Sequence, residues 1–222
     1  MAKKTLLSWS SGKDCAWALN LLKQDPDTEV AGLFAVMNER FDRGSMHGTR
    51  SQLVHRQAAA AGLPLQLLNI PDQCPHEEYE AVMRQFIDGA LAAGVERIAF
   101  GDLFLEEVRQ YRQEKLQGTG IEPVFPVWGI PTDQLAAEML AAGVQAYITS
   151  VDLKKLPASY AGRRWSRELL DQLPKGIDPC GENGEIHTAV VGGPMFNRAI
   201  PVAVGEVVER SGFAYADLIP IG

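Results

Sequence analysis

A short turn near the start of the chain brings together residue types that bind phosphate. The sequence LLSWSSGKDCAW, residues 6–17, begins as an apolar strand and ends as the first turn of a helix, with polar residues between them. Small residues let backbone N–H groups approach an anion, a helix N-terminus adds positive potential, and Lys13 adds a full charge. The turn therefore predicts a phosphate-binding site.

The spacing in this turn differs from that of a Walker A loop. A Walker A loop needs a glycine five positions before the glycine of Gly-Lys, and a serine or threonine after the lysine. Leu7 and Asp14 occupy these two positions here. From spacing alone, a Ser-capped helix start with a solvated lysine fits the turn as well as a phosphate site does.

A second polar segment, GDLFLEEVRQYR at residues 101–112, directly follows an apolar run. Arg109 and Arg112 are three residues apart, so on a helix they share a face that suits an anion. The alternative is a solvated helix face on which Glu106 pairs with Arg109. Spacing by itself favours the solvated face.

A third segment, CGENGEIHT at residues 180–188, places three titratable side chains around one turn. Asn183-Gly184 between β-like runs is a strong hairpin signal, which gives the purely structural interpretation. A hairpin does not require Glu182, Glu185 and His187 at its turn. Such groups can orient an amine or a carboxylate, bind a metal or move a proton, so the segment is also a catalytic candidate.

Residues 9–15, WSSGKDC, resemble the pyrophosphate loop SGGKDS of the PP-loop ATP pyrophosphatases, which cut ATP between the α- and β-phosphates. The chain departs from that motif twice, because Ser11 stands for a glycine and Cys15 for a serine. The first change limits backbone freedom, and the second removes a hydroxyl donor. The resemblance implies a loop that holds the β- and γ-phosphates and leaves the α-phosphate open to attack.

Together, the turn and the segments 101–112 and 181–188 resemble one branch of these enzymes, the diphthine–ammonia ligase family. The segment SMHGTR, residues 45–50, is similar to a further block of that family, and we expect His47 to be a site residue. This block and the asparagine of GENGE are more similar to the compact bacterial members. The resemblance runs from the first strand to residue 196.

The family's chemistry gives the expected function. Such enzymes use ATP and ammonia to convert the carboxylate of diphthine, a modified histidine, to an amide. The resemblance implies an ATP-dependent ligase that adenylylates a carboxylate-bearing acceptor, transfers ammonia to it, and releases AMP and pyrophosphate. Asp14, beside the lysine, is expected to help hold Mg²⁺ on the phosphates, and the adenine is expected near residues 35–37.

The expected site contains two sets of residues. The catalytic candidates, whose individual roles the sequence leaves open, are Asp102, Glu182, Glu185 and His187. The nucleotide-binding candidates are Ser10, Ser11, Gly12, Lys13, Asp14, Cys15, Val36, Met37, Gly101, Arg109 and Arg112. Asp14 is also the metal-binding candidate.

Two other functions fit parts of the sequence. Other PP-loop enzymes modify tRNA bases through the same adenylylation, but a net charge of −7 provides no basic footprint for nucleic acid. Sulfur transfer would favour paired cysteines, whereas Cys15, Cys74 and Cys180 are far apart. The other alternative is a nucleotide-binding sensor without turnover, because Cys15 could weaken the hold on pyrophosphate.

Apolar runs alternate with segments of helical spacing along most of the chain. Strands are expected at residues 5–9, 30–36, 65–70, 97–100, 123–127 and 146–151. The clearest helix spans residues 76–93 and ends at Gly94, and its apolar stripe suits either the core or a dimer surface. Another helix is expected to begin with Thr132 as its N-cap.

Strand–helix alternation predicts an α/β fold with a doubly wound parallel sheet, and the resemblance makes it the adenine nucleotide alpha hydrolase-like (HUP) type. Ligands of such sheets bind at the carboxyl ends of the strands. Residues 1–151 are expected to form the ATP-binding domain. Residues 152–222 are expected to form a small irregular α+β lobe, with a helix at 163–173 and β-like runs at 187–191 and 201–208.

The chain's ends and cysteines suggest a cellular location. The N-terminus reads neither as a signal peptide nor as a membrane span. Three scattered cysteines form no disulfide framework, which suits a reducing cytoplasm.

Overall fold

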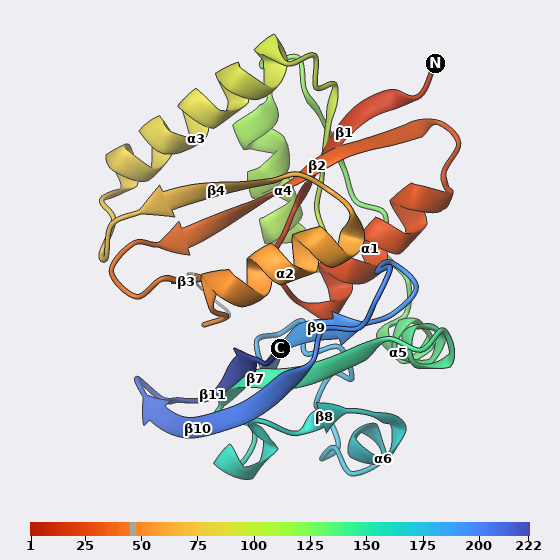
Figure 1. Cartoon of the computed structure of the whole chain (residues 1–222), viewed down its shortest axis with the longest axis vertical. Helices are drawn as coiled ribbons and strands as arrows, with labels where there is room; N and C mark the ends of the chain where they lie inside the picture. The colour runs from red at the N-terminus through yellow and green to blue at the C-terminus, as the bar shows by residue number, and fades with distance from the viewer. Residues whose placement is uncertain (45–47) are drawn as a thin grey trace.

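Two sheets are stacked with helices between them in the computed structural model of the chain (Figure 1), which describes residues 1–44 and 48–222. His47 and the rest of 45–47 lie outside the described residues, so the expected role of that block stays a prediction. The ordinary apolar fraction of 46% is enough to build one continuous core through both sheets.

The first sheet is the parallel one that the sequence predicts. Its parallel strands are β1 (Lys3–Ser8), β2 (Thr28–Asn38), β4 (Leu65–Ile70), β5 (Arg97–Ala99) and β6 (Glu122–Val124), in the order β4-β2-β1-β5-β6. A two-residue strand, β3 (Arg43–Gly44), pairs antiparallel with the end of β2. The strand order reverses between β1 and β5, and ligands of doubly wound sheets bind at such a reversal.

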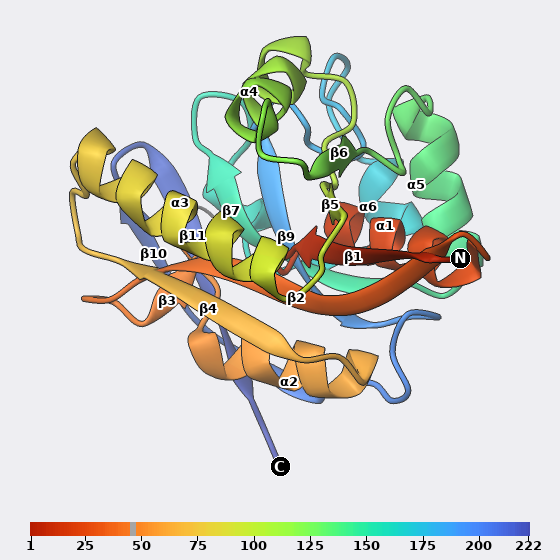
Figure 2. The ribbon, with the colours of Figure 1, turned by 90° about the horizontal axis from the view of Figure 1, so that it is seen from above.

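Helices cover both faces of the first sheet, which confirms the doubly wound arrangement (Figures 1 and 2). They are α1 (Lys13–Gln24), α2 (Ser51–Ala61), α3 (His76–Ala92) and α4 (Glu106–Leu116). Along β2, Leu33 and Ala35 belong to the core with α1 and α2, whereas Phe34 and Val36 pack with α3 and α4. This alternation follows from the two-residue period of a strand.

The second sheet is antiparallel and packs beneath α1 and α2 (Figure 1). Its strands are β7 (Gln145–Asp152), β8 (Arg164–Trp165), β9 (Ile186–Gly192), β10 (Val202–Arg210) and β11 (Phe213–Pro220). The expectation that residues 146–151 extend the parallel sheet is therefore wrong, because β7 pairs antiparallel with β8, β9 and β11. An apolar run has the same pattern in either kind of buried strand. The proposed division at residue 151 falls inside this strand.

Several element boundaries also differ from expectation. Residues 163–173 contain β8 and the short helix α6 (Arg167–Leu170) instead of one long helix. Ser166 decides this, because its hydroxyl caps α6 by accepting a hydrogen bond from Leu169 N at 3.3 Å. Thr132 is the first residue of α5 (Thr132–Ala141) and not its cap, a position that Pro131 takes.

The predicted helix at residues 76–93 is confirmed as α3, and its apolar stripe divides in two. Phe86, Ile87 and Ala90 are buried in the core. Tyr79 and Leu91 are less buried and, together with Ile87, line a cavity between α3 and α4.

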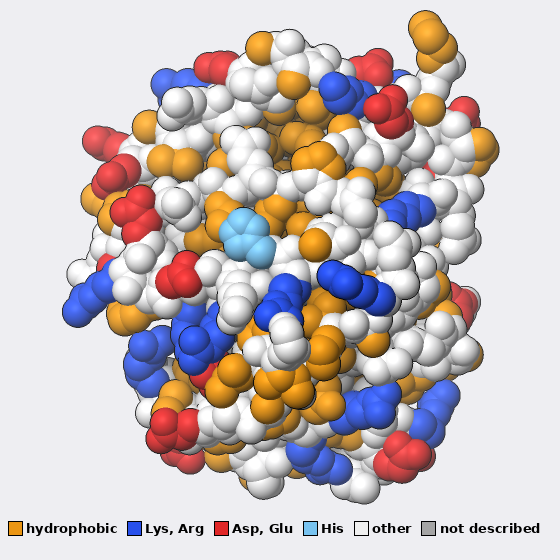
Figure 3. Space-filling model, viewed as in Figure 1, with side chains coloured by type: hydrophobic (Ala, Val, Ile, Leu, Met, Phe, Trp, Pro, Cys, Tyr) orange, Lys and Arg blue, Asp and Glu red, His pale blue; other side chains and the backbone are white. Residues whose placement is uncertain are grey.

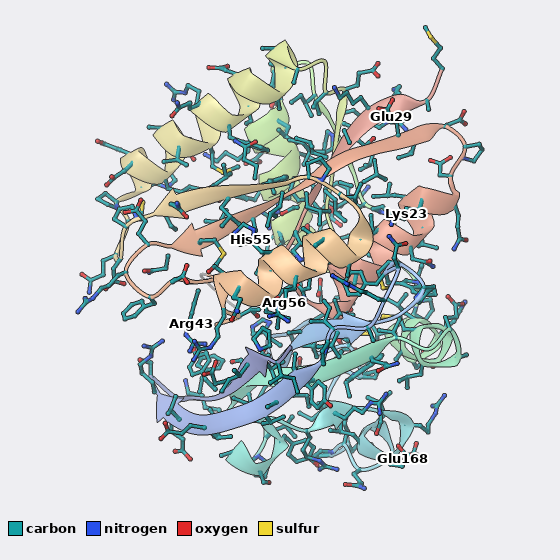
Figure 4. The ribbon with its side chains drawn as sticks, viewed as in Figure 1. Lys23, Glu29, Arg43, His55, Arg56 and Glu168 are labelled. Atoms are coloured by element: carbon teal, nitrogen blue, oxygen red, sulfur yellow. The ribbon has the colours of Figure 1, made fainter. Side chains whose placement is uncertain are left out.

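Polar contacts tie the two layers together along their boundary. Lys23, labelled in Figure 4, donates hydrogen bonds to Ala61 O at 2.8 Å and to Met195 O at 3.0 Å. Arg43 reaches from β3 to Asp217 of β11, at 3.0 Å. Figure 3 shows other lysine and arginine side chains along the same boundary. The second sheet is thus fixed against the first sheet's helices.

Two further observations concern the cysteines and the length of the helices. All three cysteines are free, as the sequence predicts. Among the described residues, every helix is too short or too polar to cross a bilayer.

Candidate functional site

One cavity of about 300 Å³ brings together the three polar segments that the sequence singles out. We call it the phosphate cavity. It lies where β1 and β5 end, at the reversal of strand order, and β9 of the second sheet closes one side. The predicted site residues that line it are Ser10, Lys13, Asp14, Cys15, Gly101, Asp102, Arg112, Glu182 and His187.

The loop after β1 owes its shape to an unusual backbone angle. Ser11 has a φ of +73°, in the left-handed region that glycine adopts freely. Its hydroxyl lies 2.8 Å from the Thr49 hydroxyl, and its carbonyl accepts hydrogen bonds from Val190 N at 2.9 Å and Gln57 Nε2 at 3.1 Å. These contacts hold Ser11 in the conformation expected of the glycine it replaces.

Two of these partners escape sequence analysis. Gln57 is fully buried on α2, where it also accepts from Trp9 Nε1 at 2.8 Å and donates to Val190 O at 2.8 Å. A glutamine within an alanine-rich helix gives no local signal of this role. Thr49 lies inside the block at residues 45–50 that the sequence singles out, but nothing in the sequence shows that its hydroxyl contacts Ser11.

The start of α1 is arranged differently from a Ser-capped helix. Gly12 is the N-cap and has no side chain with which to cap the first turn. The Lys13 N–H donates to the Thr188 hydroxyl of β9 at 3.2 Å. Lys13 is also 1% exposed, so the solvated-lysine interpretation is wrong. A helix N-terminus that faces a cavity offers its positive potential to an anion.

The Lys13 ammonium is held from several sides. Nζ lies 3.0 Å from Asp14 Oδ2, donates to Cys180 O at 2.5 Å, and sits 5.4 Å above the Trp165 ring. Burial acts to lower the pKa of Lys13, but the charge and hydrogen bond of Asp14, together with nearby Cys180 and Asp178, outweigh it, so the pKa is raised. Lys13 therefore carries a positive charge at the base of the cavity.

Cys15 takes a structural position in the loop. Its thiol donates to Gly12 O at 3.1 Å and accepts from the Ser10 hydroxyl at 3.2 Å. Burial raises the pKa of Cys15 to about 11, so the sulfur stays a neutral thiol. Cys15 thus links Ser10 to Gly12 within the turn.

Two carboxylic acids face Lys13 across the phosphate cavity. Glu182 Oε1 accepts a hydrogen bond from Leu103 N at 2.7 Å, which joins the third polar segment to the second. Burial, with the negative charges of Asp14 and Asp102, raises the pKa of Glu182 to about 7. Burial also raises the pKa of Asp102, partly offset by Arg112, whose Nε is 3.6 Å away. Neighbouring acids of this kind favour a bound cation or a shared proton.

Asp14 and Asp102 are the side chains that would hold a magnesium ion in this cavity. Asp14 Oδ1 and Asp102 Oδ2 are buried and make no hydrogen bond. Within the described part of the chain, no group of three or more acidic, histidine or cysteine side chains is placed to hold a metal alone. Mg²⁺ commonly takes one or two carboxylates and completes its shell with phosphate oxygens and water. The donor set suits that arrangement.

The segment at 180–188 is a turn leading into one strand, and not the tip of a hairpin. β9 begins at Ile186, whereas the residues before the turn are irregular. Glu185 is buried away from the phosphate cavity and accepts from Asn183 Nδ2 at 3.2 Å, so it shapes the turn. His187 does line the cavity. Burial and the charge of Lys13 lower the pKa of His187, which keeps its imidazole neutral at pH 7.

Gly101 lets the two loops of the first sheet meet. A Cβ at this position would lie 2.8 Å from both Cys15 Cα and Cys15 N. The loop after β5 can therefore contact the loop after β1 only because residue 101 has no side chain.

The two arginines of α4 have different surroundings. Arg109 stacks on Trp128 and Phe125, with its guanidinium carbon 4.7 and 5.5 Å from the ring centroids, and lies outside the phosphate cavity. Arg112 lines the cavity and lies 4.9 Å from the Phe100 ring. The pair therefore does not act as one clamp in this structure.

A second cavity, of about 270 Å³, borders the same loop. It is lined by Ser10, Ser11, Val36 and Met37, and by Tyr79 of α3. We call it the base cavity, because its apolar walls and backbone edges match those expected for an adenine. It adjoins the phosphate cavity at Ser8, Ser10 and Arg112, which line both.

Comparison with known proteins points to one family of enzymes. The chain is 29% identical over 127 residues to the diphthine--ammonia ligase of Bos taurus. The aligned region covers 55% of this chain and 48% of that protein. The same figures hold for the Homo sapiens protein. The Mus musculus protein is 25% identical over 163 residues, covering 71% of this chain and 61% of that one. The chain spans about half the length of the first two relatives.

A solved structure also matches, the U34-tRNA thiolase NcsA from Methanococcus maripaludis with its [4Fe-4S] cluster. It is 18% identical, covers 63% of this chain and 56% of the other, and has a TM-score of 0.40. A likeness this low says nothing about the chemistry of the present chain.

Matches to family models cover nearly all of the chain. Residues 3–122 match the diphthamide synthase N-terminal domain, and residues 131–217 match the diphthamide synthase C-terminal domain. The resemblance that the motifs suggested is confirmed by this pair of matches, which occur in the same chain and in the expected order. The protein therefore belongs to the diphthamide synthase family.

Proposed function

We propose that this chain is an ATP-dependent ligase that forms an amide from an acceptor carboxylate and ammonia. The observation that carries the proposal is the meeting of Lys13, Asp102 and Glu182 in one cavity at the N-terminus of α1. The names of the relatives, diphthine--ammonia ligases, support the same reaction class. By this likeness the acceptor carries a carboxylate, as diphthine does.

The orientation of ATP follows from the two adjoining cavities. The β- and γ-phosphates lie on residues 10–15, where Lys13 and the start of α1 supply positive charge. The adenine lies in the base cavity beside Val36 and Met37. The α-phosphorus then lies between the two, near Ser8 and Arg112, which line both cavities.

The reaction takes place in two substitutions. An acceptor carboxylate oxygen forms a bond to the α-phosphorus, the bond from that phosphorus to the bridging oxygen of the β-phosphate breaks, and pyrophosphate leaves. Ammonia then forms a bond to the acyl carbon, AMP leaves with the carboxylate oxygen, and the nitrogen loses one proton. Positive charge held on the leaving pyrophosphate lowers the barrier to the first substitution.

Individual residues contribute in different ways. Glu182, with a pKa raised to about 7, is suited to take the proton from the ammonia nitrogen. Neutral His187 lines the same cavity and can orient the acyl group by hydrogen bonding. Asp14 and Asp102 would hold Mg²⁺, which supplies charge neutralisation on the phosphates. Glu185 acts by shaping the turn that carries Glu182.

Two measurements test the proposal: the identity of the reaction products, and the ATP affinity of a Lys13 variant. With ATP, ammonium and a carboxylate acceptor, we expect AMP and pyrophosphate, identified by chromatography or ³¹P NMR. Lys13→Ala should weaken ATP binding by about tenfold or more, whereas Lys154→Ala, at an exposed position, should not. ADP and inorganic phosphate as products would contradict the proposed mechanism.

The same experiment distinguishes the two alternatives. Tight ATP binding without pyrophosphate release, for every acid supplied, would indicate a sensor instead of a ligase. Pyrophosphate release that depends on tRNA, together with protection of tRNA in a footprint, would indicate base modification. The net charge of −7 makes the tRNA outcome the one we do not expect.

A further inference from the structure

A third cavity, of about 590 Å³, lies between α3 and α4 on the face of the first sheet opposite the second sheet. We call it the α3–α4 cavity. Its walls include the apolar side chains of Met83, Ile87, Ile98 and Leu116. Its volume is in the range of sites for small molecules or single extended side chains. The proposed nucleotide position leaves most of this space open.

Three acidic and three basic side chains line this cavity, namely Glu80, Asp88, Glu114, Arg84, Arg112 and Lys115. The Glu80 carboxylate of α3 pairs with Lys115 Nζ of α4 at 2.5 Å, so these two side chains largely neutralise each other. Arg112 of α4 lies further along the same helix face. Its Nε makes no hydrogen bond and is 3.6 Å from Asp102 Oδ2, which is a long ion pair. A second carboxylate can therefore approach the guanidinium.

Arg112 lies where the three cavities named above meet. It lines the phosphate cavity, the base cavity and the α3–α4 cavity. Phe100, on which it stacks, lines both the phosphate cavity and the α3–α4 cavity. A molecule lying in the α3–α4 cavity can thus present one end to the guanidinium beside the expected α-phosphorus.

We propose that the α3–α4 cavity binds the apolar body of the acceptor acid, and that Arg112 orients the acid's carboxylate toward the α-phosphate. The ligand class is a carboxylic acid with an apolar body. This inference rests on the proposed ligase function, since it places the second substrate of that reaction. Arg112, one of the predicted nucleotide-binding residues, becomes the residue shared by nucleotide and acceptor.

The nucleoside is the competing occupant of this cavity. The base cavity contains Ser10 and Ser11 of the phosphate loop, whereas no residue from 10 to 15 lines the α3–α4 cavity. A nucleotide whose phosphates lie on that loop reaches the base cavity directly. The α3–α4 cavity then stays open to the other substrate, and Val36 and Tyr79 lie on its border with the base cavity.

The test measures binding of an apolar acid to the protein saturated with α,β-methylene-ATP, which cannot be cut between those phosphates. The probe is 4-phenylbutanoate, and its matched control is the uncharged 4-phenylbutanamide. Met83→Trp fills the cavity, and Leu91→Trp does so from its exposed end as a second variant. Gln85→Trp, exposed on the same helix and outside the cavity, is the control.

We expect calorimetry to show saturable binding of the acid that is weakened about tenfold or more in Met83→Trp, in Leu91→Trp and in Arg112→Gln, but not in Gln85→Trp. The amide should bind at least about tenfold more weakly than the acid to the unmodified protein. Affinity for α,β-methylene-ATP should stay within about twofold in the Trp variants.

Three results would overturn the inference. They are no binding of the acid, equal binding of acid and amide, or unchanged acid binding in both filled variants. Loss of nucleotide affinity in Met83→Trp but not Gln85→Trp would instead place the nucleoside in this cavity. A protein that fails to bind α,β-methylene-ATP at all would defeat the proposed function, and this result is separate from those above.

Discussion

At the scale of single residues, the site contains a buried charge, a carboxyl group with a raised pKa and an unusual backbone angle. Lys13 keeps its charge under complete burial because Asp14 and the Cys180 carbonyl face it. Burial and neighbouring acids raise the pKa of Glu182, which favours the uncharged form of this side chain. Ser11 holds a left-handed backbone angle that costs a non-glycine residue about 1 kcal/mol or more. Each departure predicts a measurable effect.

The raised pKa of Glu182 predicts a pH dependence of stability. The folded protein binds this proton more tightly than the unfolded chain, so stability is greatest at low pH within this window and falls as pH rises from about 4.5 to about 7. Glu182→Gln should remove that loss, on the order of 2 kcal/mol, and be more stable than the unmodified protein at pH 8.

Urea unfolding at pH 5 and at pH 8 measures this effect. Glu107→Gln, at an exposed position on α4, serves as the control and should change neither value. Equal stability of the unmodified protein and Glu182→Gln at pH 8 would show that Glu182 titrates normally. In the same variant, amide formation should fall because the proposed base is absent.

Ser11 predicts an order of stability for two variants. Ser11→Gly and Ser11→Ala both lose the hydroxyl that lies 2.8 Å from Thr49. Only glycine relieves the backbone strain at φ +73°, so Ser11→Gly should be more stable than Ser11→Ala by about 1 kcal/mol. Urea unfolding gives the comparison, and a more stable alanine variant would show that the angle is not strained.

At the scale of elements, the site depends on how closely two loops approach. The loops after β1 and β5 are brought side by side by the pairing of those strands, in which Leu6 lies opposite Ile98. α1 and α4 then begin near the same cavity, because each directly follows one of the loops. The contact between the loops is close enough that one added methyl group disturbs it.

Gly101→Ala tests this approach. The new Cβ would lie 2.8 Å from Cys15 backbone atoms, so the loop after β5 must move away from the phosphate loop. We expect ATP affinity to fall by about tenfold or more, measured by calorimetry. Gly89→Ala on α3 is the control, because a Cβ there meets nothing within 4 Å and alanine favours a helix. Unchanged ATP affinity in Gly101→Ala would show that the two loops do not act together.

At the scale of the whole molecule, the second sheet helps hold the nucleotide loop in place. Asp217 of β11 lies within 3.0 Å of Arg43 and 2.5 Å of Arg50, on either side of the segment that carries Thr49. The Arg50 hydrogen bonds, and then Arg43, lower the pKa of Asp217 to about 2. The ion pairs thus connect β11 through Thr49 to Ser11.

Asp217→Asn should weaken this connection. We expect a loss of about 1–2 kcal/mol in stability at pH 7, because the arginines are partly exposed and water screens the pairs. The difference from the unmodified protein should shrink as pH falls from about 4 to about 2, where Asp217 itself becomes protonated. Asp171→Asn, at an exposed position, is the control for urea unfolding. A difference as large at pH 2 as at pH 7 would contradict the ion-pair explanation.

Some features of this protein follow from short stretches of sequence alone. The turn at residues 10–15, the segment after β5 and the GENGEIHT segment are recognisable because each combines its residues within a dozen positions. The alternation of strands and helices predicted the doubly wound sheet, and that sheet's strand order places the first two segments together. Local spacing is enough where neighbours in the chain decide the structure.

Other features were decided only by the tertiary structure. Partners of β7 could not be read from its apolar run, because burial on both faces looks the same in parallel and antiparallel sheets. Gln57 of α2 supports the phosphate loop by a hydrogen bond to Ser11. Arg109 and Arg112 have different surroundings because Arg109 stacks on aromatic side chains that follow β6. These outcomes depend on contacts between residues far apart in the chain, which residue types and spacing do not specify.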